Sequence, residues 1–437
     1  MAGVFTHVWP YRAASRLTDR FPRAGATLLD AIVRASAGNP LVLQRALAAA
    51  EAALARARAL DRILVISDLN IGDAVMLQSA VTGLRDFLPA ARIDYAVSHL
   101  AGSLVTGNAE ATEVHPVLGG ASAGLPALRQ LIRTRRYDLI FNFCPFFAPE
   151  ALAPDGTPVV GVATLASRLI RATADPSVVA HVTTEAHRFV HGLLAPRLAP
   201  VGDQPFRGVS VWLSAEARER AAAFLRRAGL DDEPMVLLSP DASSPFTRPP
   251  LTVQTELLRR LLRLAGRVVL GAGHTEPGLE QRLLAALPPA QRARIAVLPA
   301  TLPLDGFAAV MDAAAVLVTG DTGPLHVAAA RKQRRDGALG GLRNRTALVS
   351  VFGATPARMY GYASDRAGFL PANQEAPSYA HAGASACRNL TCIRKTAKTC
   401  RSVRCFDGLD IEAVLADAGG ALAAAGRPGA IGRSTGR

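Results

Sequence analysis

The stretch VISDLNIGDAVM, residues 65–76, contains the pattern that decides the fold. It overlaps the apolar run RILVIS (62–67), which is short and rich in β-forming residues, as buried strands are. Gly72 indicates a turn, and a helical pattern follows from about residue 74 to residue 87. A strand, a tight turn and a helix in succession form the repeating unit of a parallel α/β sheet.

The same alternation continues outward through most of the 437 residues. Helical segments separate short apolar ones, which implies parallel sheets covered by helices on both faces. Between 195 and 207 the alternation stops at a stretch with three prolines, which is typical of a linker. Strands are expected at 62–67, 92–98, 111–117, 137–143 and 157–163 before the linker, and at 234–240, 267–273, 294–300, 315–320 and 346–353 after it.

Two domains are expected because the chain is too long for one ordinary domain. We predict a helical N-terminal extension at 1–58, an N-terminal Rossmann-like lobe at 59–200 and a C-terminal Rossmann-like lobe at 206–425. The alanine-rich segment 42–60 has strong helix propensity. Two interpretations of this helix are open: it packs on the first lobe, or it lays a basic face on anionic lipid.

The charge balance is strongly basic, with a net charge of +14. Such an excess attracts phosphorylated substrates, an anionic membrane surface or nucleic acid. Nucleic acid is not the expected partner, since no RNP, zinc-finger or helix-turn-helix pattern accompanies the charge. The basic, glycine-containing segment 331–345 is interpreted as a solvated insertion, with contact to phosphate or lipid as the alternative.

The sequence carries neither of the usual signs of membrane insertion or export. No uninterrupted apolar run reaches the roughly 18 residues that a membrane-spanning helix needs. Residues 1–21 lack the apolar centre of a signal peptide, and Asp19 follows soon after their arginines. We therefore expect a soluble, cytoplasmic protein.

The loops that follow the strands are the candidate sites, because open parallel sheets bind ligands beyond the carboxyl ends of their strands. In the opening stretch, Asn70 and Gly72 lie in the turn, and Asp73 stands at or near the N-cap of the helix. Asp73 is open to two interpretations. It caps the helix, or it is a carboxylate that takes a proton from a substrate hydroxyl.

The segment VTGDTGPLHVAAA (318–330) also joins a strand to a helix. Thr322 or Gly323 would be the N-cap, and Pro324 suits the first helical position. The small residues would let a pyrophosphate approach the helix amides and the positive end of the helix dipole. A well-capped structural helix is the alternative. His326 would face the same anion or pack inside.

Two further loops offer polar groups. The segment LSPDASSPFTRPP (238–250) carries Ser243, Ser244 and Arg248, whose hydroxyls and guanidinium suit a phosphate. An exposed polar turn is the alternative. In the next loop, Glu276 would accept hydrogen bonds from a ribose or serve as an ordinary acid at a helix start.

Together these segments resemble glycosyltransferase family 9, the ADP-heptose:lipopolysaccharide heptosyltransferases and their relatives. The resemblance covers about 350 residues, from 60 to 415. Its specific elements are the Gly72-Asp73 pair after the first strand and the block from Asp321 to Pro324, followed by His326. Both occur here in the family's order and at its separation.

The resemblance implies a GT-B fold, in which two Rossmann-like lobes face an interlobe cleft. The first lobe would receive the acceptor, with Asn70 and Gly72 beside it, and the second would hold a nucleotide-sugar, ADP-heptose in the family. Transfer would invert the anomeric centre without a metal, and Asp73 matches the catalytic base. The donor-binding positions are Ser243, Ser244, Arg248, Glu276, Asp321, Thr322, Gly323 and His326.

One family motif is altered in this chain. After the phosphate turn the family has lysine, any residue, tryptophan and proline, whereas this chain has Thr247-Arg248-Pro249-Pro250. Phosphate neutralisation would then fall to Arg248 or to another cation. The altered motif leaves a second class of function open, a non-catalytic nucleotide-sugar-binding or scaffold relative. A transferase that glycosylates a protein or another surface glycan is a further alternative.

Four cysteines near the C-terminus have the spacing C-x4-C-x7-C-x4-C. A structural Zn or Fe site and plain structural thiols are both open for Cys387, Cys392, Cys400 and Cys405. Cys144 stands apart and is expected to be a buried core thiol. The partners that the resemblance implies are a nucleotide-sugar, a phosphorylated glycolipid acceptor and the anionic inner face of the inner membrane.

Overall fold

The structure is a computed structural model, in which the chain forms two compact units that divide between Trp212 and Leu213. Each unit is described by itself. The residues that the structure describes are 40–67, 70–119, 124–144, 147–161, 181–201, 209–230, 234–242, 246–271, 275–331, 346–353, 355, 357–362, 377–383 and 405–426.

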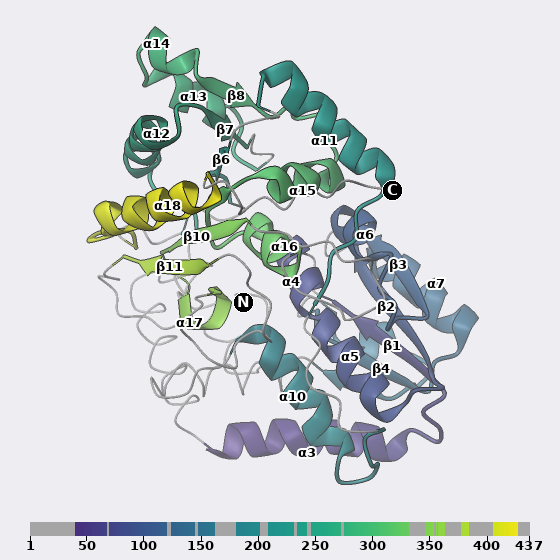
Figure 1. Cartoon of the computed structure of the whole chain (residues 1–437). Helices are drawn as coiled ribbons and strands as arrows, with labels where there is room; N and C mark the ends of the chain where they lie inside the picture. Colours follow the sequence, from purple (N-terminus) through teal and green to yellow (C-terminus); the bar gives the residue numbers. More distant parts are fainter. Residues whose placement is uncertain are drawn as a thin grey trace, which may run out of the picture. The chain divides into compact units, whose positions relative to one another are not determined.

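The first unit is built on a five-stranded sheet with the order β3-β2-β1-β4-β5 (Figure 1). All its neighbouring strands run parallel, as the alternation of strands and helices predicted. Its elements are α3 (Pro40–Arg56), β1 (Arg62–Ile66), α4 (Ile71–Met76), α5 (Gln78–Phe87), β2 (Arg92–Ser98), α6 (His99–Val105), β3 (Glu113–Leu118), α7 (Gly124–Arg135), β4 (Leu139–Asn142), α8 (Pro149–Leu152), β5 (Val159–Gly161) and α10 (Val182–Leu194).

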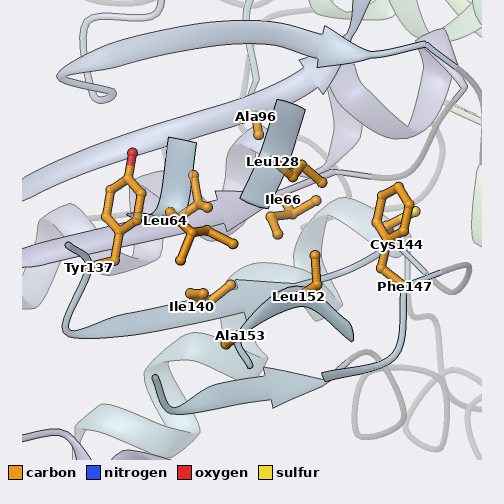
Figure 2. Close-up of a cluster of buried hydrophobic side chains, with 11 residues drawn as sticks. Leu64, Ile66, Ala96, Leu128, Tyr137, Ile140, Cys144, Phe147, Leu152 and Ala153 are labelled. Carbon is orange, nitrogen blue, oxygen red and sulfur yellow. The ribbon is translucent and has the colours of Figure 1, made fainter. Parts of the chain in front are cut away.

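Apolar side chains cover both faces of the first sheet, because successive residues of a strand point to opposite faces. On one face, Leu64 and Ile66 of β1 pack with Ile140 of β4 and Leu128 of α7 (Figure 2). Cys144 is fully buried in this same cluster, which confirms that it is a core thiol.

The other face of the first sheet lies against α4 and α10. The Tyr95 hydroxyl of β2 donates to the Ala74 carbonyl of α4, over 2.7 Å. The ring of Phe141 in β4 meets that of Phe189 in α10 edge-on, with centroids 6.4 Å apart. The expected covering of both faces is therefore confirmed for this unit.

The second unit has a six-stranded sheet with the order β11-β10-β9-β6-β7-β8, also parallel throughout (Figure 1). Its elements are α11 (Ala215–Ala228), β6 (Val236–Ser239), α12 (Leu251–Ala265), β7 (Val268–Leu270), α13 (Leu279–Ala285), α14 (Pro289–Arg292), β8 (Ile295–Val297), α15 (Leu304–Ala313), β9 (Val316–Gly320), α16 (Gly323–Arg331), β10 (Ala347–Phe352), α17 (Ala357–Tyr360), β11 (Ser378–Ala382) and α18 (Ile411–Ala425).

Each sheet reverses its winding once. In the first unit the chain moves from β1 outward to β3 and then returns to place β4 on the other side of β1. In the second unit it moves from β6 outward to β8 and returns to place β9 beside β6. Ligands of such sheets bind at this reversal, beyond the carboxyl ends of the two adjacent strands. The loops after β1, β4, β6 and β9 are therefore the candidate ligand-binding positions.

The described part of the predicted N-terminal extension is the helix α3. Ala50, Ala53 and Leu54 are buried, whereas Arg45 and Arg56 are exposed. The helix contacts β5 with part of its surface, so the packing interpretation holds for this part. Among the described residues, no helix has both the length and the apolar character that crossing a membrane requires.

Candidate functional site

The loop after β1 places an acid in the first turn of a helix. The helix α4 begins at Ile71, so its N-cap is Asn70, and Asp73 is its third residue. Asp73 is half-buried, and its Oδ2 accepts a hydrogen bond of 3.0 Å from the side-chain amide Nδ2 of Asn70. A carboxylate in the first turn is stabilised by the positive end of the helix dipole. The position allows both interpretations of Asp73, helix stabiliser and proton acceptor.

Buried residues of the first unit support the helix that carries Asp73. Tyr95 is fully buried and hydrogen-bonded to α4 through Ala74. Burial is the main cause that raises the pKa of Tyr95; the nearby charge of Asp73 adds to it, and a hydrogen bond with Ser67 opposes it. The phenol therefore stays protonated, and it fixes the start of α4 on the sheet. Gly72, beside Asp73, is buried as well.

In the second unit, hydroxyl groups tie the loop after β9 to the end of β6. The Thr319 hydroxyl donates to the Ser239 carbonyl over 3.1 Å and lies 3.2 Å from the Thr322 hydroxyl. The helix α16 then starts at Gly323, with Pro324 as its second residue. No acidic residue stands in its first turn. The first turn of α16 therefore holds no carboxylate at a place where the dipole favours an anion, and Asp321 stands two residues before it.

His326 is held inside the second unit. Only 3% of its surface is exposed. Its Nδ1 lies 3.0 Å from the Tyr362 hydroxyl, and its Nε2 lies 3.5 Å from Oδ1 of Asp321. Burial, and then the charge of Asp321, raise the pKa of Tyr362, so this residue is a neutral phenol. Of the two interpretations of His326, packing fits the structure, and the ring orients Asp321 just before α16.

Arg248 lies between two carboxylates. Its NH1 donates to Oδ1 of Asp241 over 3.1 Å, and its NH2 is 2.8 Å from Oε2 of Glu276. Glu276 also pairs with the partly exposed Arg282, over 2.7 Å. The structure thus brings two predicted site residues, Arg248 and Glu276, into direct contact. This network joins the loop after β6 to the loop after β7.

Asp241 is a member of this network that the sequence analysis did not single out. Its Oδ2 accepts bonds from the Thr275 amide over 2.9 Å and from the Thr275 hydroxyl over 2.6 Å. Burial opposes its charge, but the bonds from Thr275, Arg248 and the Ala242 amide outweigh burial and lower the pKa of Asp241. Asp241 follows β6 directly, so the rule that selects loops at strand ends would have found it.

Close backbone packing fixes the same loop against the ends of β9 and β10. A Cβ atom on Gly320, at the end of β9, would lie 2.9 Å from the Thr247 carbonyl oxygen. A Cβ atom on Gly353, after β10, would lie 2.8 Å from the Phe246 carbonyl oxygen. Only glycine fits such contacts. Arg248 therefore belongs to the same edge of the sheet as Asp321 and the start of α16.

Several predicted positions lie outside the described residues: Ser243, Ser244, Cys387, Cys392, Cys400 and most of the segment 331–345. Of the four late cysteines, the structure describes Cys405, which is buried. The metal alternative for these cysteines stays a prediction.

A family model matches a part of the chain that belongs mostly to the second unit. The glycosyltransferase family 9 (heptosyltransferase) family model matches residues 203–380. No curated protein matches the chain by sequence.

Two solved structures share the fold along most of the chain. ADP-heptose lps heptosyltransferase II of E. coli is 19% identical with a TM-score of 0.54, over 83% of this chain and 98% of that one. The glycosyl transferase family 9 protein of Veillonella parvula DSM 2008 is 17% identical with a TM-score of 0.58, over the same shares of the two chains, 83% and 98%. At these identities the likeness establishes the fold, two Rossmann-like α/β lobes of GT-B type. The chain thus carries the glycosyltransferase family 9 (heptosyltransferase) sequence pattern across residues 203–380, which confirms the resemblance for the segment that contains the block from Asp321 to Pro324.

Proposed function

We propose that this protein is an inverting glycosyltransferase that moves a heptose from ADP-heptose to a phosphorylated glycolipid of the lipopolysaccharide core. The observation that carries the proposal is the start of α16. This helix begins at the winding reversal of the second sheet, its first turn lacks an acid, and the arginine-bearing loop after β6 packs on the neighbouring strand end. Such an arrangement suits a nucleoside diphosphate.

The second unit would bind the donor. The diphosphate would lie at the backbone amides of Thr322 and Gly323, and Arg248 would neutralise part of its charge. Arg248 takes the role of the missing family lysine in this proposal. Its guanidinium has five N–H donors, and the described ion pairs with Asp241 and Glu276 engage the terminal nitrogens Nη1 and Nη2, which leaves further N–H groups for a phosphate. Glu276 would accept hydrogen bonds from the ribose hydroxyls.

The first unit would supply the base. Asp73 would take the proton of the acceptor hydroxyl while the hydroxyl oxygen forms a bond to the anomeric carbon. The bond between that carbon and the diphosphate oxygen breaks in the same step, so the configuration inverts. The negative charge that develops on the departing diphosphate would be stabilised by the start of α16 and by Arg248. No metal takes part in this scheme.

In this proposal, the acceptor and the cellular location are inferred from the net charge of the protein. A net charge of +14 attracts a phosphorylated glycolipid and an anionic bilayer alike. We propose that the protein acts at the cytoplasmic face of the inner membrane as a peripheral protein. The exposed arginines of α3, Arg45 and Arg56, are available for this contact in the first unit.

The test is a transfer assay with purified protein. ADP-heptose and a truncated core glycolipid are supplied together, and ADP release and the mass of the glycolipid are followed; incubations without acceptor correct for donor hydrolysis. The proposal predicts ADP release that depends on the acceptor and a glycolipid heavier by one heptose.

Two other outcomes identify the alternatives. If nucleotide-sugars bind, as calorimetry would show, but neither ADP-heptose nor other nucleotide-sugars are turned over with any acceptor, the protein is a non-catalytic binding relative. If ADP release requires a protein acceptor and not the glycolipid, the transferase proposal stands and its acceptor is wrong.

A further inference from the structure

A cluster of two histidines and one aspartate joins two helices of the first unit, away from the loop that carries Asp73. Asp86 belongs to α5, and His187 and His191 belong to α10. The two helices lie side by side (Figure 1). They approach closely at Gly83, where a Cβ atom would lie 3.2 Å from the Val190 Cβ and 3.4 Å from the His187 Cδ2.

The geometry of this cluster is compact. Oδ2 of Asp86 lies 3.0 Å from Nε2 of His187 and 2.8 Å from Nε2 of His191. The two imidazoles are one helical turn apart, and their centroids lie 4.2 Å from each other. All three ligand atoms are within 4.8 Å of one another. Metal–ligand bonds of about 2.0–2.2 Å put the ligands of a tetrahedral ion roughly 3.3–3.6 Å apart, so the 2.8 and 3.0 Å separations would have to widen by about half an ångström.

We propose that Asp86, His187 and His191 form a binding site for a divalent transition-metal ion of the zinc type. Two imidazole nitrogens and one carboxylate oxygen are a donor set that such ions prefer, whereas Mg²⁺ and Ca²⁺ favour oxygen ligands. Each histidine binds through the Nε2 lone pair, with its ring proton on Nδ1. The ion is structural and is separate from the glycosyl transfer, for which the proposed scheme needs no metal.

The burial of the three side chains is graded from the interior to the surface. The Asp86 side chain is 1% exposed, that of His187 is 10% exposed and that of His191 is 29% exposed. An ion therefore reaches the cluster from the His191 side, where water completes the fourth position. The ring of Phe87 packs edge-on against His191, with centroids 4.7 Å apart, and orients that imidazole.

A second acid–histidine cluster of the first unit has guanidinium groups beside its acids, and we do not propose a metal there. Asp94, Glu113 and His115 also come close together, at the amino end of the sheet. Two guanidinium groups contact these acids there: Arg92 lies 3.1 Å from Asp94, and Arg135 lies 2.9 Å from Glu113. These fixed cations already compensate the carboxylates, so this cluster is a salt-bridge network.

An ion at the proposed site would connect distant parts of the sequence. It would join residue 86 to residues 187 and 191, and so hold α10 against α5. Since the unfolded chain does not preform this site, binding would stabilise the folded first unit.

The experiment measures Zn²⁺ binding by calorimetry on full-length, tag-free protein stripped with a chelator. The variants are His191→Ala and, in case that cavity disturbs folding, His191→Gln. His99→Ala is the matched control, because His99 is an exposed histidine of the same unit. We expect wild type and His99→Ala to bind Zn²⁺ with equal affinity. Both His191 variants should bind Zn²⁺ more than about tenfold more weakly, because the loss of even a residue that only supports a ligand lowers metal affinity by about 10- to 100-fold. Zn²⁺ should raise the melting temperature of wild type and His99→Ala only.

Two results would overturn the proposal. One is the absence of Zn²⁺ binding by wild type. The other is binding that both His191 variants retain at full affinity, which would place the ion elsewhere, for example at the late cysteines. Co²⁺ spectra provide an independent reading: the proposed site gives ligand-field bands without the thiolate charge-transfer band that cysteine ligands produce.

Discussion

The helices α4 and α16 both follow a central strand of their sheet, yet their first turns differ in charge. The first turn of α4 contains Asp73, held by Asn70 at 3.0 Å. The first turn of α16 contains no acid, and the nearest one, Asp321, stands before the helix and contacts His326. Helix ends of the same polarity are thus used in two ways. One stabilises a carboxylate of the protein, and the other is where the proposed function puts the diphosphate.

This difference in charge matches the two roles in the proposed reaction, proton transfer by the first unit and diphosphate binding by the second. A carboxylate within α4 suits proton transfer and would repel a diphosphate. A helix start without an acid suits the diphosphate and offers no proton acceptor of its own. Substitutions in either helix start test this division.

The largest effect is expected for Asp73→Asn. The amide keeps the size of the side chain but cannot take a proton, so the transfer rate should fall by about 10²- to 10⁴-fold. Donor affinity should stay unchanged, because the proposal puts the donor-binding site in the other unit. Rates come from ADP release and affinities from calorimetry.

The matched control for Asp73→Asn is Asp410→Asn. Asp410 is also a carboxylate at a helix start, where it caps α18 through the Ala413 amide over 3.0 Å. Its variant should keep the wild-type rate. Equal activity of Asp73→Asn and wild type would remove Asp73 from the mechanism and leave it as a helix stabiliser.

A smaller effect is expected for Arg248→Ala. Its removal leaves Asp241 and Glu276 without the guanidinium that bridges them. The free energy of unfolding should fall by about 1.5–3 kcal/mol, the range for hydrogen bonds to charged groups, and ADP should bind more weakly. Arg248→Lys should restore part of the affinity, since it keeps the charge without the fork.

Arg282→Ala is the control for Arg248→Ala. It also removes a guanidinium from Glu276, but from a side chain that is 45% exposed. Arg282→Ala should lower the free energy of unfolding by less than about 1 kcal/mol. If both variants lost the same stability and ADP affinity, the central role of Arg248 at this edge would be wrong. Chemical denaturation and calorimetry give the two quantities.

The difference in charge between the two helix starts is removed when α16 is given an acid in its first turn, as α4 has. Pro324→Glu places a carboxylate in the first turn of α16, and Pro324→Gln is its uncharged control. The dipole should stabilise the glutamate by about 0.3–1 kcal/mol relative to glutamine. ADP, however, should bind to Pro324→Glu about tenfold more weakly than to Pro324→Gln, through repulsion between the like charges. Equal ADP affinities would show that the start of α16 holds no phosphate.

The smallest effect concerns the support of Asp241. Thr275→Val removes the hydroxyl that donates to Asp241 over 2.6 Å, and should cost about 0.5–1.5 kcal/mol at pH 7. Hydrogen bonding lowers the pKa of Asp241 in the folded state, so this stability is present above the unfolded pKa of about 3.9 and is lost as the pH falls below it. The difference between wild type and variant should therefore shrink below about pH 4 in denaturation experiments. A difference that is constant with pH would contradict the role of the Asp241 charge.

Much of the fold was predictable because both sheets are parallel and buried. Buried parallel strands are continuous apolar runs, and ten of them were expected near their observed positions, from β1 to β10. The strand β11 was missed, because its sequence SYAHA mixes polar and small residues, and four of its five residues are not fully buried.

The parts of the site that depend on one loop were also predictable. Asp73, Gly323 and Arg248 follow from strand ends and turn chemistry. The pairing of Arg248 with Asp241 and Glu276 was not, since it depends on β6 and β7 being neighbours. The cluster at Asp86 was missed for the same reason, as its members come from helices that are far apart in the sequence.

The reversed winding also has a consequence for how each unit is made. The central strands pair only across long stretches of chain: Ile63 with Leu139 in the first sheet, and Val236 with Val316 in the second. Loops of this length close slowly, so the strand pairs at their ends form late in folding. During synthesis, β9 therefore cannot join the second sheet before the chain beyond residue 316 has left the ribosome, whereas β6 and β7 are already able to pair.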